Sequence, residues 1–488
     1  MGRAWFVRCT WAAVIVVAIG QVGGQTAPGE ELVGHGVLVS DVRVGAGEGQ
    51  ERSVAFDVTW PESWRGPERP SWVAASDTWD AAWVFVKVRA PGDTWRHARL
   101  AARGHEASAG VALEVPADGM GAFVYRDAPG YGDMVASVRL SWDGPASGVP
   151  TDAQAEVLVF AIEMVFVPEG PFWLGCGGGN DGGFRAGGTA GAPYDVSGQT
   201  SIELIDAAGA LYWQETGHAG VPQGRTNASF PTGYEAFYVM KHHVTQAQYA
   251  AFLNSLTPTQ AEARTYWGES YRHALVGSAD GAYATSLPWV AMNMMSWSDG
   301  AAFADWAGLR PLTELEFEKV ARGPVAPVPN EFAWGSTTIV AATALANAGA
   351  PDEAAEPEWA NANFGQRLTP QGPLRVGSFA LPGRSREAAG AGYYGALEVS
   401  GNLWERVVSV GNDAGRSFTG AHGDGDLDEA GDATITGWPA ADGVGVGFRG
   451  GGWFNPEEHL RVSNRFAAAL ARDARDGSGG FRAARSAP

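Results

Sequence analysis

The run Arg449-Gly450-Gly451-Gly452-Trp453, near the end of the chain, limits the possible folds more than any other stretch. Glycine loses more backbone entropy on folding than other residues, so three in a row indicate positive φ angles or a close approach to another backbone. A polar loop follows from Asn455 to Asn464. The later Gly480-Phe481-Arg482 run predicts a short closing strand that places Phe481 inside. Taken alone, these features predict a glycine-rich hairpin.

Upstream segments give this run a context. Five of them occur in order, namely Met164 to Gly175, Phe237 to Tyr249, Ser296 to Phe303, Arg310 to Glu318 and Gly401 to Glu405. Each motif is weak alone, but the ordered set is specific. With the glycine run, it resembles the formylglycine-generating enzyme family, also called sulfatase-modifying factors, over residues 161–486. The resemblance implies an α+β, C-type-lectin-like fold with little regular secondary structure.

The residues ahead of this region have the pattern of an all-β domain. Val54, Phe56, Val58 and Trp60 alternate with more polar residues, and this period of two places them on one buried face of a strand. Short strands separated by turn residues are typical of a β-sandwich. We therefore expect a β-sandwich domain over residues 25–150, with a boundary in the Gly-, Pro- and Ser-rich segment 143–152.

Tryptophans are concentrated in this N-terminal region. They are Trp60, Trp64, Trp72, Trp79, Trp83 and Trp95. One interpretation is a platform that stacks on sugar rings. The other, which we favour, is packing in the core and between domains, because tryptophan is highly buried on average.

The first 24 residues have the pattern of a secretory signal peptide. Arg3 and Arg8 supply positive charge, and the apolar run from Trp11 to Ile19 is too short for a comfortable membrane span. We expect a secreted protein that is extracellular, periplasmic or attached to the cell surface, and no membrane span.

If the signal is removed, Cys176 is the one remaining cysteine, so the mature protein has no internal disulfide.

The net charge of −20 disfavours a nucleic-acid partner, because an acidic surface repels phosphate.

Three segments of the family-like region have the signals of helices. Thr245, Ser296 and Thr313 are each a plausible N-cap, ahead of helices ending near Leu256, Gly308 and Arg322. His242 and His243 precede the first helix, and neighbours on a strand point to opposite faces, so we do not expect them to share a metal.

A structural calcium site is expected around the Gly401–Glu405 turn. Carboxylates and turn carbonyls are the oxygen ligands that calcium prefers. The family carries a calcium at the matching positions, which are Glu398, Gly401, Leu403 and Glu405. The resemblance also suggests a second calcium near Asn363 and Phe364, although no matching aspartate is present there. The alternative for Glu405 is a buried carboxylate that accepts backbone N–H bonds.

The chain departs from the family where the chemistry is carried out. Formylglycine-generating enzymes resemble one another in a cysteine pair after the glycine motif, and two thiolates suit a soft monovalent copper ion. Here Asn455 stands where the first cysteine belongs, and Leu460 stands at about the second position. No copper and no formylglycine-generating activity are therefore expected.

Two functions remain open. The first is a non-catalytic relative that binds a glycan, peptide or protein partner through its C-terminal loop surface. The candidate contacts are Trp453, Asn455, His459, Arg461, Asn464 and Arg465. In a plainer version, Trp453 and Arg465 only brace the loop.

The second function is an oxidoreductase acting on a protein or peptide, since the superfamily includes iron-dependent sulfoxide synthases. Those enzymes use a separate histidine-rich helical domain, whereas the nine histidines here are scattered.

Overall fold

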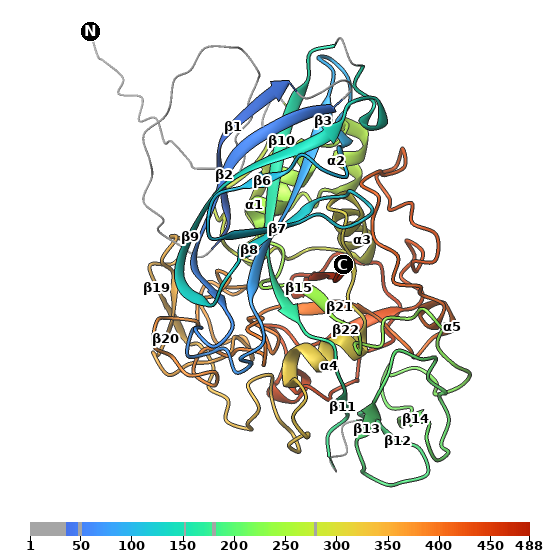
Figure 1. The fold of residues 1–488 in the computed structure, drawn as a ribbon. Helices are drawn as coiled ribbons and strands as arrows, with labels where there is room; N and C mark the ends of the chain where they lie inside the picture. Colours follow the sequence, from blue (N-terminus) through green and yellow to red (C-terminus); the bar gives the residue numbers. More distant parts are fainter. Residues whose placement is uncertain (1–35, 47–50, 151–152, 178–181, 278–280) are drawn as a thin grey trace.

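A computed structural model describes residues 36–46, 51–150, 153–177, 182–277 and 281–488, and Figure 1 shows its fold. The predicted signal peptide over residues 1–24 lies outside the described residues. Strands outnumber helices, in agreement with the predicted α+β class. None of the helices in these ranges combines the length and apolar character that a membrane crossing requires.

Two large antiparallel sheets dominate the N-terminal half. The first has the order β1-β2-β9-β5, with β6 also on β9, and the second has the order β18-β24-β15-β10-β3-β8-β7, with β4 on β3. The N-terminal strands are β1 (Leu38–Ala46), β2 (Glu51–Arg65), β3 (Asp80–Arg89), β4 (Arg96–His97), β5 (Arg99–Leu100), β6 (Glu106–Ala107), β7 (Val111–Glu114), β8 (Ala122–Arg126) and β9 (Gly130–Asp143). A 3₁₀ turn, Pro145–Ser147, precedes β10 (Glu156–Val167).

The remaining elements are short. The strands of the second sheet are completed by β15 (Phe237–Met240), β18 (Arg310–Pro311) and β24 (Ala483–Ser486). Small pairs and a three-stranded sheet are built from β11 (Phe172–Leu174), β12 (Arg185–Ala186), β13 (Tyr194–Val196), β14 (Leu211–Tyr212), β16 (Leu275–Gly277), β17 (Tyr283–Thr285), β19 (Ala344–Ala346), β20 (Ala354–Glu356), β21 (Trp404–Val408), β22 (Val446–Arg449) and β23 (Gly479–Gly480). The helices are α1 (Gln246–Asn254), α2 (Pro258–Arg264), α3 (Trp297–Trp306), α4 (Glu314–Arg322) and α5 (Asp413–Arg416), with a 3₁₀ turn at Glu457–Leu460.

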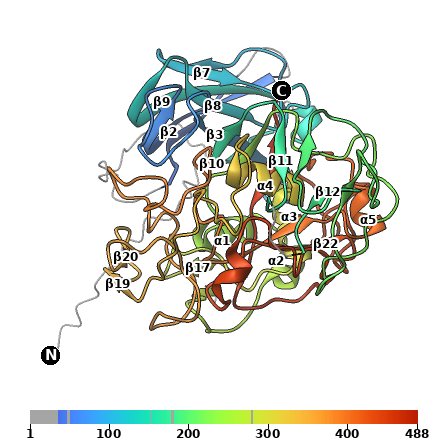
Figure 2. The same ribbon diagram turned by 90° about the horizontal axis from the view of Figure 1, so that it is seen from below.

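The second sheet is covered on both faces. Along β3, Val84, Val86 and Val88 face the first sheet, whereas Trp83 and Phe85 face the helices. The same alternation runs along β10, and both strands are buried over nearly their whole length. Figures 1 and 2 show the resulting order of layers, with the first sheet outermost, the second in the middle and α1 and α3 beyond it.

Hydrogen bonding continues across the predicted domain boundary. Strand β10 lies just after that boundary and pairs with β3 over ten positions, from Glu156–Arg89 to Val165–Asp80. Its C-terminal end also pairs with β15, so strands from both predicted domains form one sheet. The N-terminal strands do face each other as two sheets across an apolar core, but one of these sheets is shared with the family-like region.

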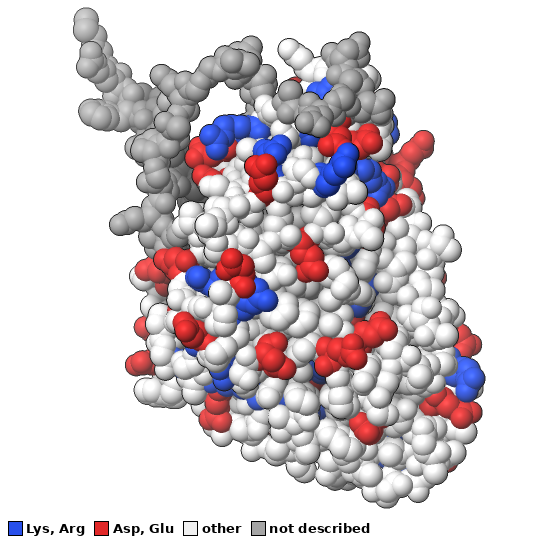
Figure 3. Space-filling model, in the orientation of Figure 1, with Lys and Arg blue, Asp and Glu red and all other residues white. Residues whose placement is uncertain are grey.

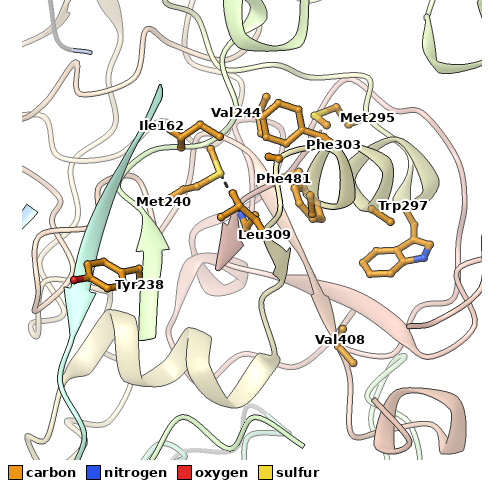
Figure 4. Close-up of a cluster of buried hydrophobic side chains, with 14 of the residues drawn as sticks. Ile162, Tyr238, Met240, Val244, Met295, Trp297, Phe303, Leu309, Val408 and Phe481 are labelled. Atoms are coloured by element: carbon orange, nitrogen blue, oxygen red, sulfur yellow. Dashed lines mark hydrogen bonds between the residues drawn. The ribbon is translucent and has the colours of Figure 1, made fainter. Parts of the chain in front are cut away.

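Local capping signals fix the helix starts. Thr245, Ser296 and Thr313 each form a capping box with the residue three positions on, as the sequence predicts. Helix α2 was not predicted, although Thr257 and Gln260 form a fourth box. Within α3, Gly300 permits close contact, because a Cβ there would lie 2.2 Å from the Phe481 ring. Figure 4 shows Phe481 buried beside α3, as its sequence motif predicts.

A buried ion-pair network, which we call the Glu314 network, ties the glycine run to α4. Arg449 donates to Glu314 Oε2 at 3.0 Å and to Glu318 Oε1 at 2.6 Å. Arg465 also binds both carboxylate oxygens of Glu314, at 2.8 and 2.9 Å. Glu314 and Glu318 lie one turn apart on α4, so they share a face. These four side chains are fully buried, and their charges are therefore satisfied by one another.

Most of the N-terminal tryptophans pack in the interior, as we favoured. Trp60, Trp64, Trp72 and Trp83 are at most 1% exposed. Trp79 stacks on Phe166 with ring centroids 3.8 Å apart. Trp95 differs, because it is partly exposed and lines a pocket between the N-terminal strands and the family-like region.

The surface carries both signs of charge. On the face shown in Figure 3, acidic and basic side chains are interspersed, and basic side chains of the described residues form no broad patch there.

The shared sheet predicts that the two halves unfold together. Trp83→Ala should lower the free energy of unfolding by about 3–5 kcal/mol, because a fully buried ring and its hydrogen bond to the Ala307 carbonyl are lost. Calorimetry should show one transition that moves as a whole. Val135→Ala, at a 65% exposed position of β9, is the control and should change little. Two separate transitions, of which one moves, would contradict the prediction.

The Glu314 network predicts an acid-sensitive stability. Burial alone raises the pKa of Glu314, but Arg465 and Arg449 outweigh it and hold the pKa below its usual value. A lowered folded-state pKa stabilises the protein above the unfolded pKa of about 4.3, and this contribution is lost as the pH falls. Glu314→Gln should cost about 3–5 kcal/mol at pH 7, since it leaves buried arginines without their partner.

Urea unfolding at several pH values tests this prediction. The difference between wild type and Glu314→Gln should shrink below about pH 4. Glu106→Gln, which removes the exposed pair with Arg139, is the control and should have little effect. A gap that stays constant down to pH 3 would contradict the assignment.

Candidate functional site

The glycine run turns the chain sharply beneath the C-terminal loop surface. Gly450 and Gly451 have φ angles of +85° and +66°, the left-handed values that the glycine triplet predicts. A Cβ on Gly450 would lie 2.5 Å from the Val399 carbonyl oxygen, so a larger residue does not fit. The turn directs Trp453 inward, and its indole Nε1–H donates to the Gly477 carbonyl at 2.7 Å.

An aromatic pocket of about 470 Å³ opens beside this turn. We call it the aromatic pocket. Its lining includes the rings of Tyr271, Trp404, Phe448, Trp453, Phe454, His459 and Phe466, and the polar residues Asn455, Arg472, Asp476 and Ser478. Trp404 and Phe448 are nearly buried and form its floor. Tyr271, Phe454 and Phe466 remain 45%, 54% and 45% exposed around it.

The walls of the aromatic pocket are held in place by hydrogen bonds. The His218 N–H donates to the Phe466 carbonyl at 2.7 Å. The His459 ring stacks on Phe466 with centroids 5.1 Å apart, and burial lowers the pKa of His459. On another side, the buried Arg406 guanidinium donates to the carbonyls of Arg472 and Ala474. The pocket is therefore largely formed before any ligand arrives.

The structure brings together only part of the predicted binding set. Trp453, Asn455 and His459 line the aromatic pocket. Arg461 and Asn464 do not line it, and the Asn464 side chain instead accepts from the Phe466 N–H. Arg465 is fully buried in the Glu314 network, with its guanidinium 4.0 Å from the Phe184 ring centroid.

Several pocket residues were missed by the sequence analysis. Phe454 and Phe466 flank the predicted loop, and their apolar rings in a polar segment could have been noticed. Tyr271 and Trp404 come from distant segments, and no local pattern links them to this loop.

The residues expected to bind calcium lie close together in the interior. Glu398 Oε1 accepts from the Gly377 N–H at 2.8 Å, and Glu405 Oε1 accepts from Arg482 Nε at 2.8 Å. The second oxygen of each carboxylate has no hydrogen-bond partner, although both side chains are buried. Burial raises the pKa of Glu398 to about 7 despite the opposing charge of Arg482, and it raises the pKa of Glu405 as well.

Backbone contacts join the two expected calcium sites. The Asn402 N–H, between Gly401 and Leu403, donates to the Asn363 carbonyl at 3.0 Å, and Phe364 follows directly. No cluster of three or more His, Cys, Asp or Glu side chains suited to a metal occurs among the described residues. Glu398 and Glu405 each keep one carboxylate oxygen without a hydrogen-bond partner, and such oxygens are the type of ligand that a hard cation prefers. Calcium here remains a prediction.

The neighbouring histidines face different carboxylates. His242 Nδ1 lies 3.7 Å from Glu398 Oε2, and His243 Nε2 lies 3.6 Å from Glu405 Oε1. Burial lowers the pKa of His242 to about 3, so its imidazole is neutral at pH 7.

The positions of the missing cysteines differ in environment. Asn455 lies at the aromatic pocket, where its Oδ1 accepts from the Gly452 N–H. Leu460 is fully buried in an apolar cluster. Cys176 is buried too, and it does not line the aromatic pocket.

If calcium binds at this site, the melting temperature should be higher with calcium than after its removal. A cation that binds only the folded chain stabilises it by about 2.7 kcal/mol at a hundredfold excess over its Kd. Chelation should therefore lower the Tm, and Glu398→Gln should reduce the difference between the two conditions. Elemental analysis of the purified protein should find calcium. Identical melts with and without chelator, or copper or iron near one per chain, would contradict the prediction.

Comparison with known proteins agrees with the motifs. The Sulfatase-modifying factor enzyme 1-like domain matches residues 160–487. Hercynine oxygenase from Mycolicibacterium smegmatis is 34% identical over 112 residues, which are 23% of this chain and 20% of that relative. The chain thus spans about a fifth of the relative's length. Because the domain match covers more than half of the chain, this protein belongs to the sulfatase-modifying factor enzyme 1-like family.

Proposed function

We propose that this chain is a secreted, non-catalytic member of its family that binds a peptide or protein partner in the aromatic pocket. The observation that carries the proposal is the rim of Tyr271, Phe454 and Phe466, whose rings stay largely exposed around an apolar floor. Exposed apolar side chains around a concave site are typical of a binding surface.

The lining favours a peptide over a glycan. Trp404 and Phe448 offer an apolar floor, so an aliphatic or aromatic side chain of a partner would be desolvated there without losing hydrogen bonds. Sugar hydroxyls would lack partners on the same floor. The Arg472 guanidinium can donate to the partner's main-chain carbonyls, whereas Asn455 and Asp476 already form hydrogen bonds within the loops that hold them.

The absence of catalysis rests on the residues that replace the cysteine pair. Neither Asn455 nor Leu460 offers a thiolate for copper. Export rests on the pattern of residues 1–24 alone.

A second candidate is an oxidoreductase that acts on a peptide or a small molecule. The partial likeness to hercynine oxygenase favours it, although the likeness covers a fifth of that enzyme. A redox metal near one per chain would favour this candidate over the first.

Peptide selection tests the first candidate. A library of random 12-residue peptides displayed on phage is panned against the purified protein, and the affinity of a selected peptide is measured by fluorescence anisotropy. Phe454→Ser and Phe466→Ser should each weaken binding roughly tenfold, because exposed aromatic anchors contribute most at such sites. Trp359→Ser, at a 71% exposed ring that does not line the pocket, is the matched control and should bind normally.

The proposal fails if the selected peptides bind the two rim variants as well as wild type. It also fails if no peptide is enriched while a redox metal is found.

A further inference from the structure

A second pocket, of about 430 Å³, lies where the N-terminal strands meet the family-like region. We call it the junction pocket. One wall comes from β3 and the turn that leads into β4, with Lys87, Trp95 and Arg96. The other wall comes from the connection between α1 and α2, from Trp306 and from the loop at Asp426. No residue of the aromatic pocket lines it.

The junction pocket has a fixed shape. Gly425 has a φ of +85°, and a Cβ there would lie 2.4 Å from the His97 ring, so the loop rests directly against the N-terminal strands. The Gly425 carbonyl accepts from Lys87 Nζ at 3.0 Å. The Trp306 indole Nε1–H donates to Ser255 Oγ at 2.8 Å, which fixes that ring as well.

Lys87, Arg96 and Asp426 line this pocket with donors and acceptors that the protein itself does not fully pair. Lys87 is 2% exposed, and its ammonium has three N–H donors but one hydrogen-bond acceptor among the described residues. Arg96 and Asp426 are both exposed, and among the described residues neither the guanidinium nor the carboxylate has a hydrogen-bond partner in the protein. Burial lowers the pKa of Lys87 to about 7, although the charge of Asp426 opposes this shift.

We propose that the junction pocket binds a neutral carbohydrate. A small anion would face Asp93 and Asp426, and a small cation would face Lys87 and Arg96. Each sugar hydroxyl both donates and accepts, so one ligand can accept from Lys87 and Arg96 and donate to the Asp426 carboxylate at the same time.

Aromatic rings complete the match. Trp95 is the one N-terminal tryptophan that lines this pocket, and the ring of Trp306 lies 5.3 Å from Lys87 Nζ. Arg89 lies over the Trp95 ring at 4.2 Å and is itself paired with Glu156, so this ring is held in position. The partly exposed Trp95 ring suits the apolar C–H face of a sugar, whereas Trp306 is 3% exposed and only backs the pocket.

A ligand titration tests the proposal on the full chain. Maltose, cellobiose, xylobiose and N,N′-diacetylchitobiose are titrated and followed by isothermal titration calorimetry, with phosphate and putrescine as the charged probes. At least one disaccharide should bind. Arg96→Ala, Asp426→Asn and Trp95→Ala should each weaken this binding at least tenfold, and all three lie at exposed or partly exposed positions that folding tolerates.

Two controls keep the outcome specific. Arg103→Ala removes another exposed arginine, and Phe466→Ser alters the aromatic pocket, so both should leave sugar binding unchanged. The proposal is overturned if none of the four disaccharides binds, or if binding survives the junction variants. It is also overturned if phosphate or putrescine binds instead and is lost with Arg96→Ala or Asp426→Asn. Because the two pockets share no lining residue, failure here leaves the peptide proposal standing.

Discussion

The carboxylate of Glu314 is the centre on which the C-terminal region depends. It holds Arg449, at the end of β22, and Arg465, at the end of the following loop, where both guanidinium groups are fully buried. A guanidinium buried there without this partner would be very unfavourable, so helix, strand and loop are stable only together. Arg482 plays a similar part beside Glu405, where it also donates to the carbonyls of Met240, Lys241 and Leu397. Ion pairs therefore order a region that has few long strands or helices.

What could be predicted from the sequence follows from how local each signal is. A capping box is complete within four residues, so Thr245, Ser296 and Thr313 marked their helix starts correctly. The alternation along β2 is also local, and its predicted face is buried. The shared sheet could not be predicted from the sequence. A strand such as β3, which is buried on both faces, is an apolar run, and such a run does not indicate which strands pair with it. The sequence also does not indicate the partner of Arg465. This residue pairs with Glu314, which lies 151 residues earlier in the chain, so no local pattern links the two.

The two pockets differ in how the chain forms them. The aromatic pocket is made largely by loops of the family domain, which the Glu314 network and Arg406 hold in place. The junction pocket exists because the N-terminal strands dock against that domain, with Gly425 resting on His97. A rigid apolar hollow and a rigid polar hollow suit ligands of different chemistry, and one molecule could hold both at once.

Strand β24 has a consequence for the order of folding during synthesis. Residues 483–486 pair with β15 on one side and with β18 on the other, so they lie inside the second sheet and not at its edge. The neighbouring strands keep unpaired backbone groups until these residues have been made. A chain synthesised only as far as residue 482 therefore still has an open second sheet. A nascent chain with this open sheet is exposed to chaperones for longer than one whose sheet closes early.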